Sequence, residues 1–463
     1  MTARWKDDLR VFPTLRGYRR SWLSRDLVAG ISFGAITIPG QLATAHLAGM
    51  PPITGLYGFL AACLMAAVFA ANRHLALGMD STIAPMLAAG LVSLGLVAGT
   101  PEYVGMALVT TMLVGVLLLI IGFGKMGWFG DFLSRPVVTG FLGGIAIIIV
   151  VNQLPQFFGV ESQGERTVAR LWNVMAALPE VSVPTLVVGI SSLLLLLILS
   201  RFGPRFPSAL IVLTVSIIAS NVFDLNAMGV DTLGRLKSGL PDLTFPPITY
   251  GAVEAVLGTA LAIAVICIAQ TAATTRTAAA VGGFETDINA DFRAVGAANF
   301  LSSIFGSFTA NASPPSTTII SESRGRSQVT SLFACVLVVI VMFASGLIEA
   351  LPEATLSAIL LFIAIRIFHL DEMRSMKRYS WRAFGLMLTA LLGVVVLGVA
   401  YGVALAVIIS VLDRARRTAR PELLRLARTP EGVWVPQRMK GSEEHPGVAV
   451  FHLNGPLWFG NAN

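Results

Sequence analysis

Long apolar runs, separated by short polar or Gly- and Pro-containing stretches, recur along almost the whole chain. A membrane-spanning helix needs about 20 mostly apolar residues. The longest runs are Leu108–Phe123, Pro136–Leu154, Val183–Leu199, Ala209–Phe223, Val253–Ala273, Ser331–Leu351 and Phe384–Leu412. Shorter runs, which suit short or broken spans, are Leu27–Ala45, Thr54–Ala71, Ala84–Val97 and Leu356–Phe368. The pattern predicts an all-α polytopic membrane protein with about 12–14 spans.

Two segments begin unlike the other spans. Asp80-Ser81-Thr82 precedes the short run Ile83–Val97, and Ser313-Pro314-Pro315-Ser316 precedes an even shorter run. Ser and Thr side chains cap first-turn amides, and Pro suits the first helical position, so both segments are typical of helix starts. Because non-helical backbone survives in a bilayer only where it is buried or lines a cavity, we expect two half-helices with facing N-termini. Ordinary loops at the membrane surface are the alternative.

Facing half-helix N-termini present positive dipole ends and free amides, which bind an anion without a cationic side chain. We therefore predict a site for a small anion in this part of the protein. Its candidate ligands are Ser81, Thr82, Ala312, Ser313, Ser316 and Thr317. Helix capping alone is the alternative role for the hydroxyl residues among them.

Four more polar residues lie in or beside the apolar runs. Gln41 and Gln270 lie inside spans, where polar side chains usually face the bundle interior. We interpret both as substrate ligands, with hydrogen bonding between helices as the alternative. Asp80 stands beside the predicted site, and a carboxylate there repels an anion unless it is protonated or paired. Asp80 and His46 are therefore the candidates for proton coupling, against the alternatives of a loop residue and an interfacial residue.

Composition and charge support this class of protein. The 463 residues are 55% hydrophobic and only 13% charged, whereas soluble domains carry nearer a quarter charged residues. The net charge of +7 does not indicate nucleic acid, because the basic residues flank the spans, as on the cytoplasmic side of membrane proteins. They are Arg4, Lys6, Arg10, Arg16, Arg19, Arg20 and Arg25, then Arg414, Arg416, Arg417, Arg420, Arg425 and Arg428. We expect both termini in the cytoplasm and no nucleic-acid partner.

The sequence does not support catalytic or cofactor-binding classes. Cys63, Cys267 and Cys335 all lie inside apolar runs, as small core residues do, and the five histidines lack metal-ligand spacing. The sequence also has no Walker loop, so ATP binding is not expected. We therefore expect no cofactor, no metal and no enzymatic activity.

The chain divides into two hydrophobic halves of similar length. We predict an amphipathic cytoplasmic lead, a first membrane repeat, a linker, a second repeat and a charged cytoplasmic linker, over 1–25, 26–224, 225–249, 250–413 and 414–446. Two such halves are typical of transporters built from inverted repeats, with the substrate at the repeat interface. Val448–Leu453 has the pattern of a soluble strand, and we expect residues 447–463 to begin a truncated domain.

Several motifs resemble those of one transporter family. The first half carries Arg25-Asp26-Leu27-Val28-Ala29-Gly30 and then His46–Tyr57. Asp131–Val137, Asp287–Asp291 with Gly296 and Asn299, and Val448–Asn461 follow in the order of the family pattern. Together these segments resemble the sulfate permease family, also called solute carrier family 26, over nearly the whole chain.

The resemblance implies about 14 segments as two inverted repeats of seven, with broken third and tenth segments. It implies a core domain that moves against a gate domain, with the substrate between the two broken segments. It further implies a cytoplasmic regulatory (STAS) domain, a homodimer and the inner membrane of a bacterium.

Three positions depart from the family pattern. Many relatives have a Ser-Arg pair where this chain has Pro314-Pro315, many bacterial relatives have Glu at the position of Gln270, and Gly40 stands where a Gln or Glu often follows the first-span proline. These departures argue against simple chloride or bicarbonate transport. We predict proton symport of a dicarboxylate such as fumarate, with sodium as the alternative coupling ion. A sulfate, bicarbonate or chloride transporter, an uncoupled anion channel, and a prestin-like membrane motor or sensor are the alternatives.

Overall fold

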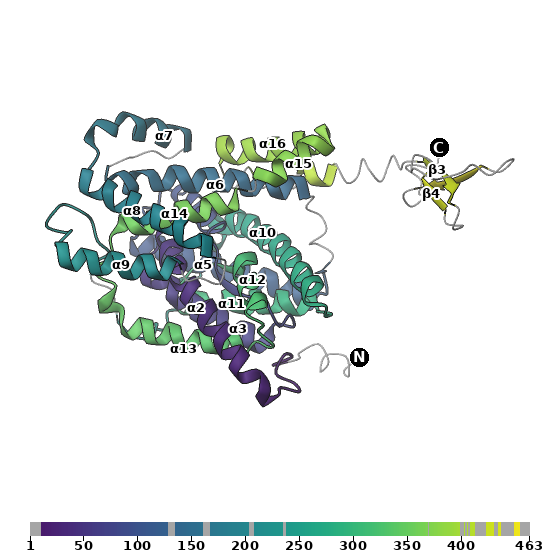
Figure 1. Cartoon of the computed structure of the whole chain (residues 1–463), viewed down its shortest axis with the longest axis horizontal. Coiled ribbons are helices and arrows are strands. Elements are labelled where there is room, and N and C mark those ends of the chain that lie inside the picture. Colours follow the sequence, from purple (N-terminus) through teal and green to yellow (C-terminus); the bar gives the residue numbers. More distant parts are fainter. Residues whose placement is uncertain are drawn as a thin grey trace.

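Helices form most of the protein as far as residue 412 (Figure 1). The computed structural model describes residues 11–127, 135–160, 167–202, 208–234, 238–368, 370–398, 402, 405, 408–412, 423–429, 434–436 and 449–453. Residues 1–10 of the predicted lead, residues 131–134 of the family motif and most of the 414–446 segment lie outside the described residues.

The first half contains helices α2 to α9, a strand and three short 3-10 turns. They are η1 Arg20–Trp22, α2 Leu23–Leu47, α3 Pro52–Phe69, β1 Leu77–Met79, α4 Ala84–Val92, α5 Pro101–Phe123, α6 Arg135–Phe158, α7 Thr167–Ala176, η3 Leu178–Glu180, α8 Val183–Leu199, η4 Ser200–Phe202 and α9 Ser208–Phe223. The second half has α10 Tyr250–Gly282, α11 Ile288–Ile304, β2 Ala310–Ala312, α12 Pro314–Glu322, α13 Val329–Phe343, η5 Ser345–Leu347, α14 Glu353–Ile367, α15 Leu370–Tyr379 and α16 Trp381–Leu397.

The two halves repeat the same order of elements, and several corresponding elements have equal lengths. The short helices α4 and α12 have 9 residues each, α7 and α15 have 10 each, and α8 and α16 have 17 each. A three-residue strand precedes the short helix in each half. The prediction of two repeats with broken third and tenth segments is therefore confirmed, and the strands at the breaks are an addition to it.

Seven helices of the described chain are long and apolar enough to cross a membrane, and α9, α13 and α16 are shorter apolar helices. Their starts follow the expected capping chemistry. At α5, the Thr100 hydroxyl accepts a hydrogen bond from the Tyr103 N–H, and Pro101 occupies the first turn. The prediction of a polytopic membrane protein is confirmed.

Helices from the two halves pack in two groups (Figure 1). In the core group, α5 packs on α10 and α11, and α13 packs on α2 and α3. In the gate group, α6 packs on α14 and α16, and α14 packs on α8. Helix α2 also contacts α14 and α9, which joins the groups. The arrangement matches the core and gate domains that the resemblance implies.

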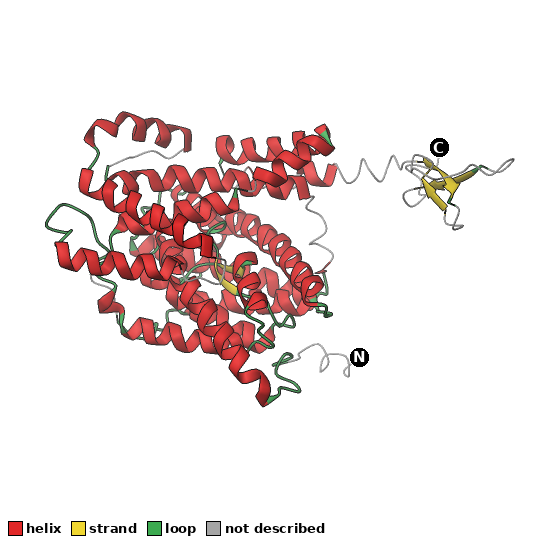
Figure 2. Ribbon diagram, in the orientation of Figure 1, coloured by secondary structure: helices red, strands yellow, loops and turns green. Residues whose placement is uncertain are grey.

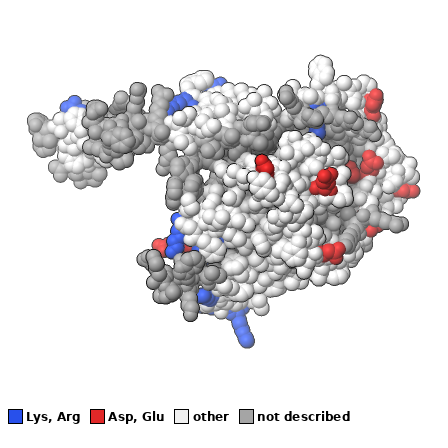
Figure 3. Space-filling model, turned by 180° about the vertical axis from the view of Figure 1, so that it is seen from behind, with Lys and Arg blue, Asp and Glu red and all other residues white. Residues whose placement is uncertain are grey.

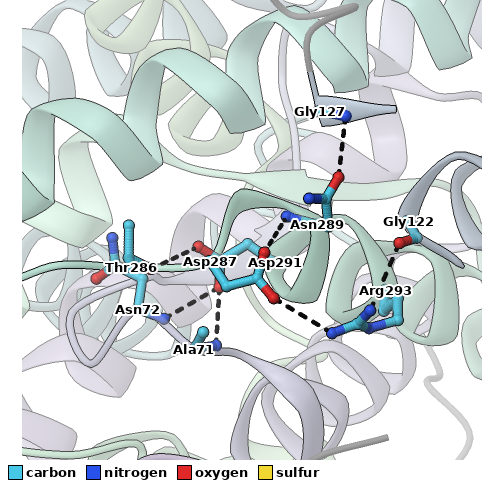
Figure 4. Close-up of polar contacts among 9 residues, drawn as sticks. All are labelled: Ala71, Asn72, Gly122, Gly127, Thr286, Asp287, Asn289, Asp291 and Arg293. Atoms are coloured by element: carbon cyan, nitrogen blue, oxygen red, sulfur yellow. Dashed lines mark hydrogen bonds and ion pairs between the residues drawn. The ribbon is translucent and has the colours of Figure 1, made fainter. Parts of the chain in front are cut away.

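A buried carboxylate at the start of α11 fastens the loop between α3 and β1 (Figure 4). Asp291 Oδ1 accepts hydrogen bonds from the backbone N–H groups of Ala71 at 2.9 Å and Asn72 at 3.1 Å. Its Oδ2 accepts from the hydroxyls of Thr275 at 2.9 Å and Thr286 at 3.3 Å. A carboxylate with several donors holds buried backbone amides that would otherwise lack partners. A residue of the second repeat thus fixes the approach to the broken span of the first.

Asp26 of α2 performs the reciprocal role for the loop between α12 and α13. Fully buried, it accepts hydrogen bonds from the backbone N–H groups of Arg326 and Ser327. The hydroxyls of Ser327, at 2.8 Å, and Thr330, at 3.4 Å, also donate to it. Each broken span is therefore fastened to a helix of the other repeat.

The start of α11 is also attached to the end of α5 (Figure 4). Asp287 caps α11 through the Asn289 N–H, and its carboxylate lies 3.5 Å from the Arg293 guanidinium. Arg293 also donates to the Gly122 carbonyl, and the Gly127 N–H donates to Asn289 Oδ1 at 2.9 Å. These contacts give the family-like segment Asp287–Asp291 a structural role.

A three-stranded antiparallel sheet lies C-terminal to the helices. Strand β3, Leu423–Arg428, pairs with β4, Trp434–Pro436, and with β5, Val450–Leu453. The strand predicted at Val448–Leu453 is present as β5. The range 414–446 differs from the predicted linker, because β3 and β4 lie in it. In β3, Arg425 and Arg428 fall on opposite faces, so the segment lacks the polar–apolar alternation by which a strand is recognised in a sequence. The assignment of this sheet to a STAS domain stays a prediction.

The crossing of α2 and α3 depends on a glycine. A Cβ at Gly55 would overlap the backbone oxygen of Gln41, whereas a Cβ at Gly258 of α10 would meet nothing within 4 Å. We expect Gly55→Ala to push the helices apart, because overpacking of a tight contact costs about 1–3 kcal/mol. Its thermal unfolding temperature in detergent should fall below that of the parent. Gly258→Ala is the matched control and should leave the temperature unchanged or higher; equal behaviour of both variants would contradict the packing argument.

Candidate functional site

The two broken spans meet at a pair of strands enclosed by helices (Figure 2). Strands β1 and β2 run antiparallel, and all their residues are buried. The cross-strand partners are Leu77 and Ala312, Gly78 and Asn311, and Met79 and Ala310. Each strand thereby supplies partners for polar backbone groups of the other, as buried backbone requires. The expected meeting of the two breaks is confirmed.

A side-chain amide covers the outer edge of each strand. Gln41 Oε1 accepts from the Met79 N–H at 2.7 Å, and Gln41 Nε2 donates to the Met79 carbonyl at 3.4 Å. On the other side, Asn299 Oδ1 accepts from the Ala310 N–H and Asn299 Nδ2 donates to the Ala310 carbonyl, both at 2.9 Å. The carboxamides of α2 and α11 therefore act as the missing neighbouring strands and close the ladder on both sides.

These contacts define the position of Gln41 and add Asn299 to the site. Both ends of the Gln41 amide are bonded to Met79, so this side chain supports β1; direct contact with a substrate stays a prediction. The sequence predicts no site role for Asn299, whose only signal there is its place in the family-like segment that begins at Asp287. Its function depends on a contact with β2 that spacing along the chain does not reveal.

Asp80 lies at the end of β1 and is buried. Its Oδ1 accepts from the N–H and the hydroxyl of Thr82, both at 2.8 Å. Its Oδ2 accepts from Gln270 Nε2 at 2.7 Å and from Asn311 Nδ2 at 3.2 Å. All four donors are neutral, and among the described residues no Lys or Arg forms an ion pair with this carboxylate. The predicted site residues Thr82 and Gln270 thus both contact the carboxylate of Asp80.

The amides at the two half-helix starts have partners within the chain. The Thr82 N–H donates to Asp80, and the Ser316 N–H donates to the Ser313 hydroxyl oxygen, which caps α12. Pro314 and Pro315 carry no N–H. The helix dipoles still point at the junction, but the donors left for a solute are mainly side-chain hydroxyl and amide groups. This differs from the expectation of free main-chain amides.

The hydroxyl residues at the start of α12 divide into two sets. Thr317 supports the strand pair, because its Oγ1 accepts a hydrogen bond from the Ala76 N–H at 3.1 Å. Ser313 Oγ lies 3.0 Å from Ser316 Oγ, which in turn lies 3.5 Å from Thr37 Oγ1 of α2. Pro314 beside them is exposed. Ser313, Ser316 and Thr37 therefore form a hydroxyl cluster next to an open side of α12.

The remaining predicted residues lie around this junction at different depths. Ala312 is fully buried at the end of β2, and Ser81 is half-buried in the turn after Asp80. His46 lies five positions after Gln41 on α2, or about 7 Å along the helix axis. In the described part of the chain no hydrogen bond joins His46 to Asp80, so the two predicted coupling residues do not form one cluster.

The fold and the site define a class: secondary transporters in which discontinuous helices of two repeats meet at the binding site. The model of the Sulfate permease family matches residues 23–390, and the chain belongs to this family. Its members are anion transporters and not enzymes.

Individual relatives agree with this assignment. A probable sulfate transporter of Mycobacterium tuberculosis is 34% identical over 96% of this chain and 80% of its own length. Prestin of Danio rerio is 27% identical over 96% of this chain and 64% of its own. The murine Solute Carrier 26 family member A9 anion transporter has the same fold, with a TM-score of 0.85 at 22% identity over 100% of this chain and 80% of that one. The transmembrane domain of a cyanobacterium bicarbonate transporter gives 0.72 at 22% identity over 85% of this chain and 98% of its own.

Removal of the Asn299 amide should weaken the junction. In Asn299→Leu, the N–H and C=O of Ala310 lose their partners, and each orphaned buried group costs about 1–3 kcal/mol. We expect a marked fall in thermal unfolding temperature in detergent. Asn221→Leu on α9 is the control, because that exposed amide bonds only to the Ile217 carbonyl of its own helix. If both variants unfold at the parent's temperature, the amide does not close the ladder.

Proposed function

We propose that the protein is a proton-coupled symporter of a divalent oxyanion and that Asp80 carries the coupled proton. The observation behind this proposal is the Asp80 carboxylate, which lies where the two broken spans meet and, among the residues that the structure describes, accepts hydrogen bonds only from neutral donors. We place the substrate at the same junction, because discontinuous helices of two repeats frame the binding site in transporters of this architecture. The negative substrate and the negative carboxylate then repel each other across a short distance.

Coulomb's law gives the energy of this repulsion. At roughly 6 Å and an effective dielectric constant of about 20, two unit charges repel by about 3 kcal/mol, and a dianion doubles the repulsion. A proton on Asp80 removes this repulsion and converts one acceptor oxygen into a donor. Binding of the anion and binding of the proton therefore favour each other, and this coupling is reciprocal. Cotransport follows if the two are carried together as the core moves against the gate.

The chemistry of the junction suits a divalent oxyanion. The hydroxyls of Thr37, Ser313 and Ser316 and the amide of Gln270 are neutral donors, which suit the several acceptor oxygens of sulfate or of a dicarboxylate. Sulfate is favoured by the names of the Mycobacterium tuberculosis relatives. A dicarboxylate such as fumarate, and sodium in place of the proton, stay predictions that the same flux measurement decides.

Charge asymmetry supports an orientation with both ends of the chain in the cytoplasm. Helix ends on the side where α2 begins carry Arg73, Lys125, Arg201, Arg366 and Lys377, together with Glu285, Asp287, Asp371 and Glu372. The opposite ends carry Glu102, Glu180, Asp231, Glu254 and Glu349, with Arg170 of α7 as a basic residue among them. In Figure 3 the blue and red side chains accordingly gather toward opposite sides of the molecule. Basic flanks mark the cytoplasmic side. A bacterial inner membrane fits this orientation, and a homodimer stays a prediction.

Asp80→Asn should separate transport from its coupling. The purified chain in liposomes should accumulate labelled sulfate when the outside is acidic, and the variant should lose this gradient-driven accumulation. Because Asn is a neutral analogue of protonated Asp, sulfate exchange without a gradient should persist. Glu102→Gln, an exposed carboxyl at the start of α5, is the matched control and should behave as the parent.

Two results would count against the proposal. Accumulation by Asp80→Asn equal to that of the parent would exclude Asp80 as the proton carrier. Flux of sulfate and fumarate that ignores the pH gradient in the parent itself would indicate a channel, an exchanger or sodium coupling. Replacement of sodium by potassium in the same vesicles identifies the last of these.

A further inference from the structure

The Asp80 carboxylate has two amide neighbours whose situations differ. Both donate to Oδ2, Gln270 Nε2 at 2.7 Å and Asn311 Nδ2 at 3.2 Å. A carboxamide presents donors at one end and an acceptor at the other. Each amide therefore suits a charged carboxylate in one orientation and a protonated one in the opposite orientation.

Asn311 gains nothing by turning. Its Oδ1 already accepts a hydrogen bond from the Thr271 hydroxyl at 3.1 Å while its Nδ2 donates to Asp80. The residue lies in β2 and is fully buried. Both ends of its amide are thus satisfied as they stand.

Gln270 is well bonded at one end only. The Thr82 hydroxyl lies 3.3 Å from its Oε1 and 2.8 Å from Asp80 Oδ1, and both oxygens can accept from it. A hydroxyl has one hydrogen, so the shorter bond to Asp80 leaves Gln270 Oε1 with the weaker contact while Asp80 is charged. Gln270 is also half-buried on α10, at the edge of the cluster.

Protonation of Asp80 reverses this balance. A proton on Oδ2 takes one acceptor site of that atom and points toward Gln270, so the new O–H and the Gln270 N–H face each other as two donors. The remaining lone pair of Oδ2 still accepts from Asn311 Nδ2. If the amide turns by half a rotation, the bond from Nε2 to Oδ2 breaks and two bonds form: Oδ2–H donates to Oε1, and Nε2–H donates to Thr82 Oγ1. The Thr82 hydroxyl keeps its bond to Oδ1. Every polar atom of this set then has a partner.

We propose that Gln270 is a positioning residue for proton coupling, whose amide turns each time Asp80 gains or loses its proton. The inference rests on the proposed role of Asp80 in proton symport and adds the group that stabilises both protonation states. Glu at this position cannot donate to a charged carboxylate when it is itself ionised, and an apolar side chain can neither donate nor accept. A carboxamide serves both states and holds α10 against the start of α4 in each.

Infrared difference spectra of the whole chain in lipid vesicles, between alkaline and acidic buffer, test this inference. We expect two bands in the parent: the carbonyl of a newly protonated carboxyl, and a shifted side-chain amide. Asp80→Asn should lose both. Gln270→Met should lose the amide shift and keep the carboxyl band. If the Met variant does not fold, Gln270→Glu serves in its place, because it keeps the shape of the side chain. It should also lose the amide shift.

Gln153→Met, at a buried amide on α6, is the control and should change neither band. The inference is overturned if the carboxyl band depends on Asp80 but Gln270→Met removes no amide shift. In that case the proposed function stays intact. Absence of any carboxyl band that Asp80→Asn removes shows instead that Asp80 takes up no proton, so the proposed function fails with the inference.

Discussion

The structure depends on one constraint: buried backbone polar groups must find partners where two spans are broken inside the membrane. Here the partners come from the other broken span, through the β1–β2 pair, and from the amides of Gln41 and Asn299 at the two outer edges. Without such partners, the exposed groups would each cost several kcal/mol in hydrocarbon. The position of every residue at the site follows from this solution.

A consequence of that solution is a junction with little fixed positive charge. The prolines at the start of α12 remove two amides, and the caps of Ser313 and Asp80 occupy others. The polar groups around the junction are neutral hydroxyls and amides with one carboxylate among them. In the proposed mechanism, the proton neutralises that carboxylate and takes the place of a resident cation.

The sequence predicts the fold better than it predicts the site. The apolar runs, and the Ser- and Pro-rich segments at Asp80–Thr82 and Ser313–Ser316, identify the spans and the two breaks because these features are local. The roles of Gln41 and Asn299 depend on hydrogen bonds to Met79 and Ala310, and Asp26 and Asp291 act on loops of the opposite repeat. Such contacts join residues on different elements, from 11 to more than 300 positions apart, so periodicity and capping rules do not reveal them.

Strands β3 and β4 are not predicted from the sequence for a different reason, which is the charged residues around them. Strand patterns are short and tolerate alternate polar residues, so a charged stretch between apolar runs resembles a linker. In the membrane part the long spans are unambiguous, because a span of about 20 residues is too long to be mistaken for a strand. The three-residue strands β1 and β2 are too short to be predicted from any pattern.

Because each broken span is completed by the other repeat, the order of synthesis matters for assembly. Ala76 and Thr317 are joined by a hydrogen bond across 241 positions, and a ribosome adds about 5–20 residues per second. Strand β1 thus leaves the ribosome on the order of ten to fifty seconds before β2 exists. Through that interval β1 lacks the partners that β2 and Thr317 supply in the folded protein.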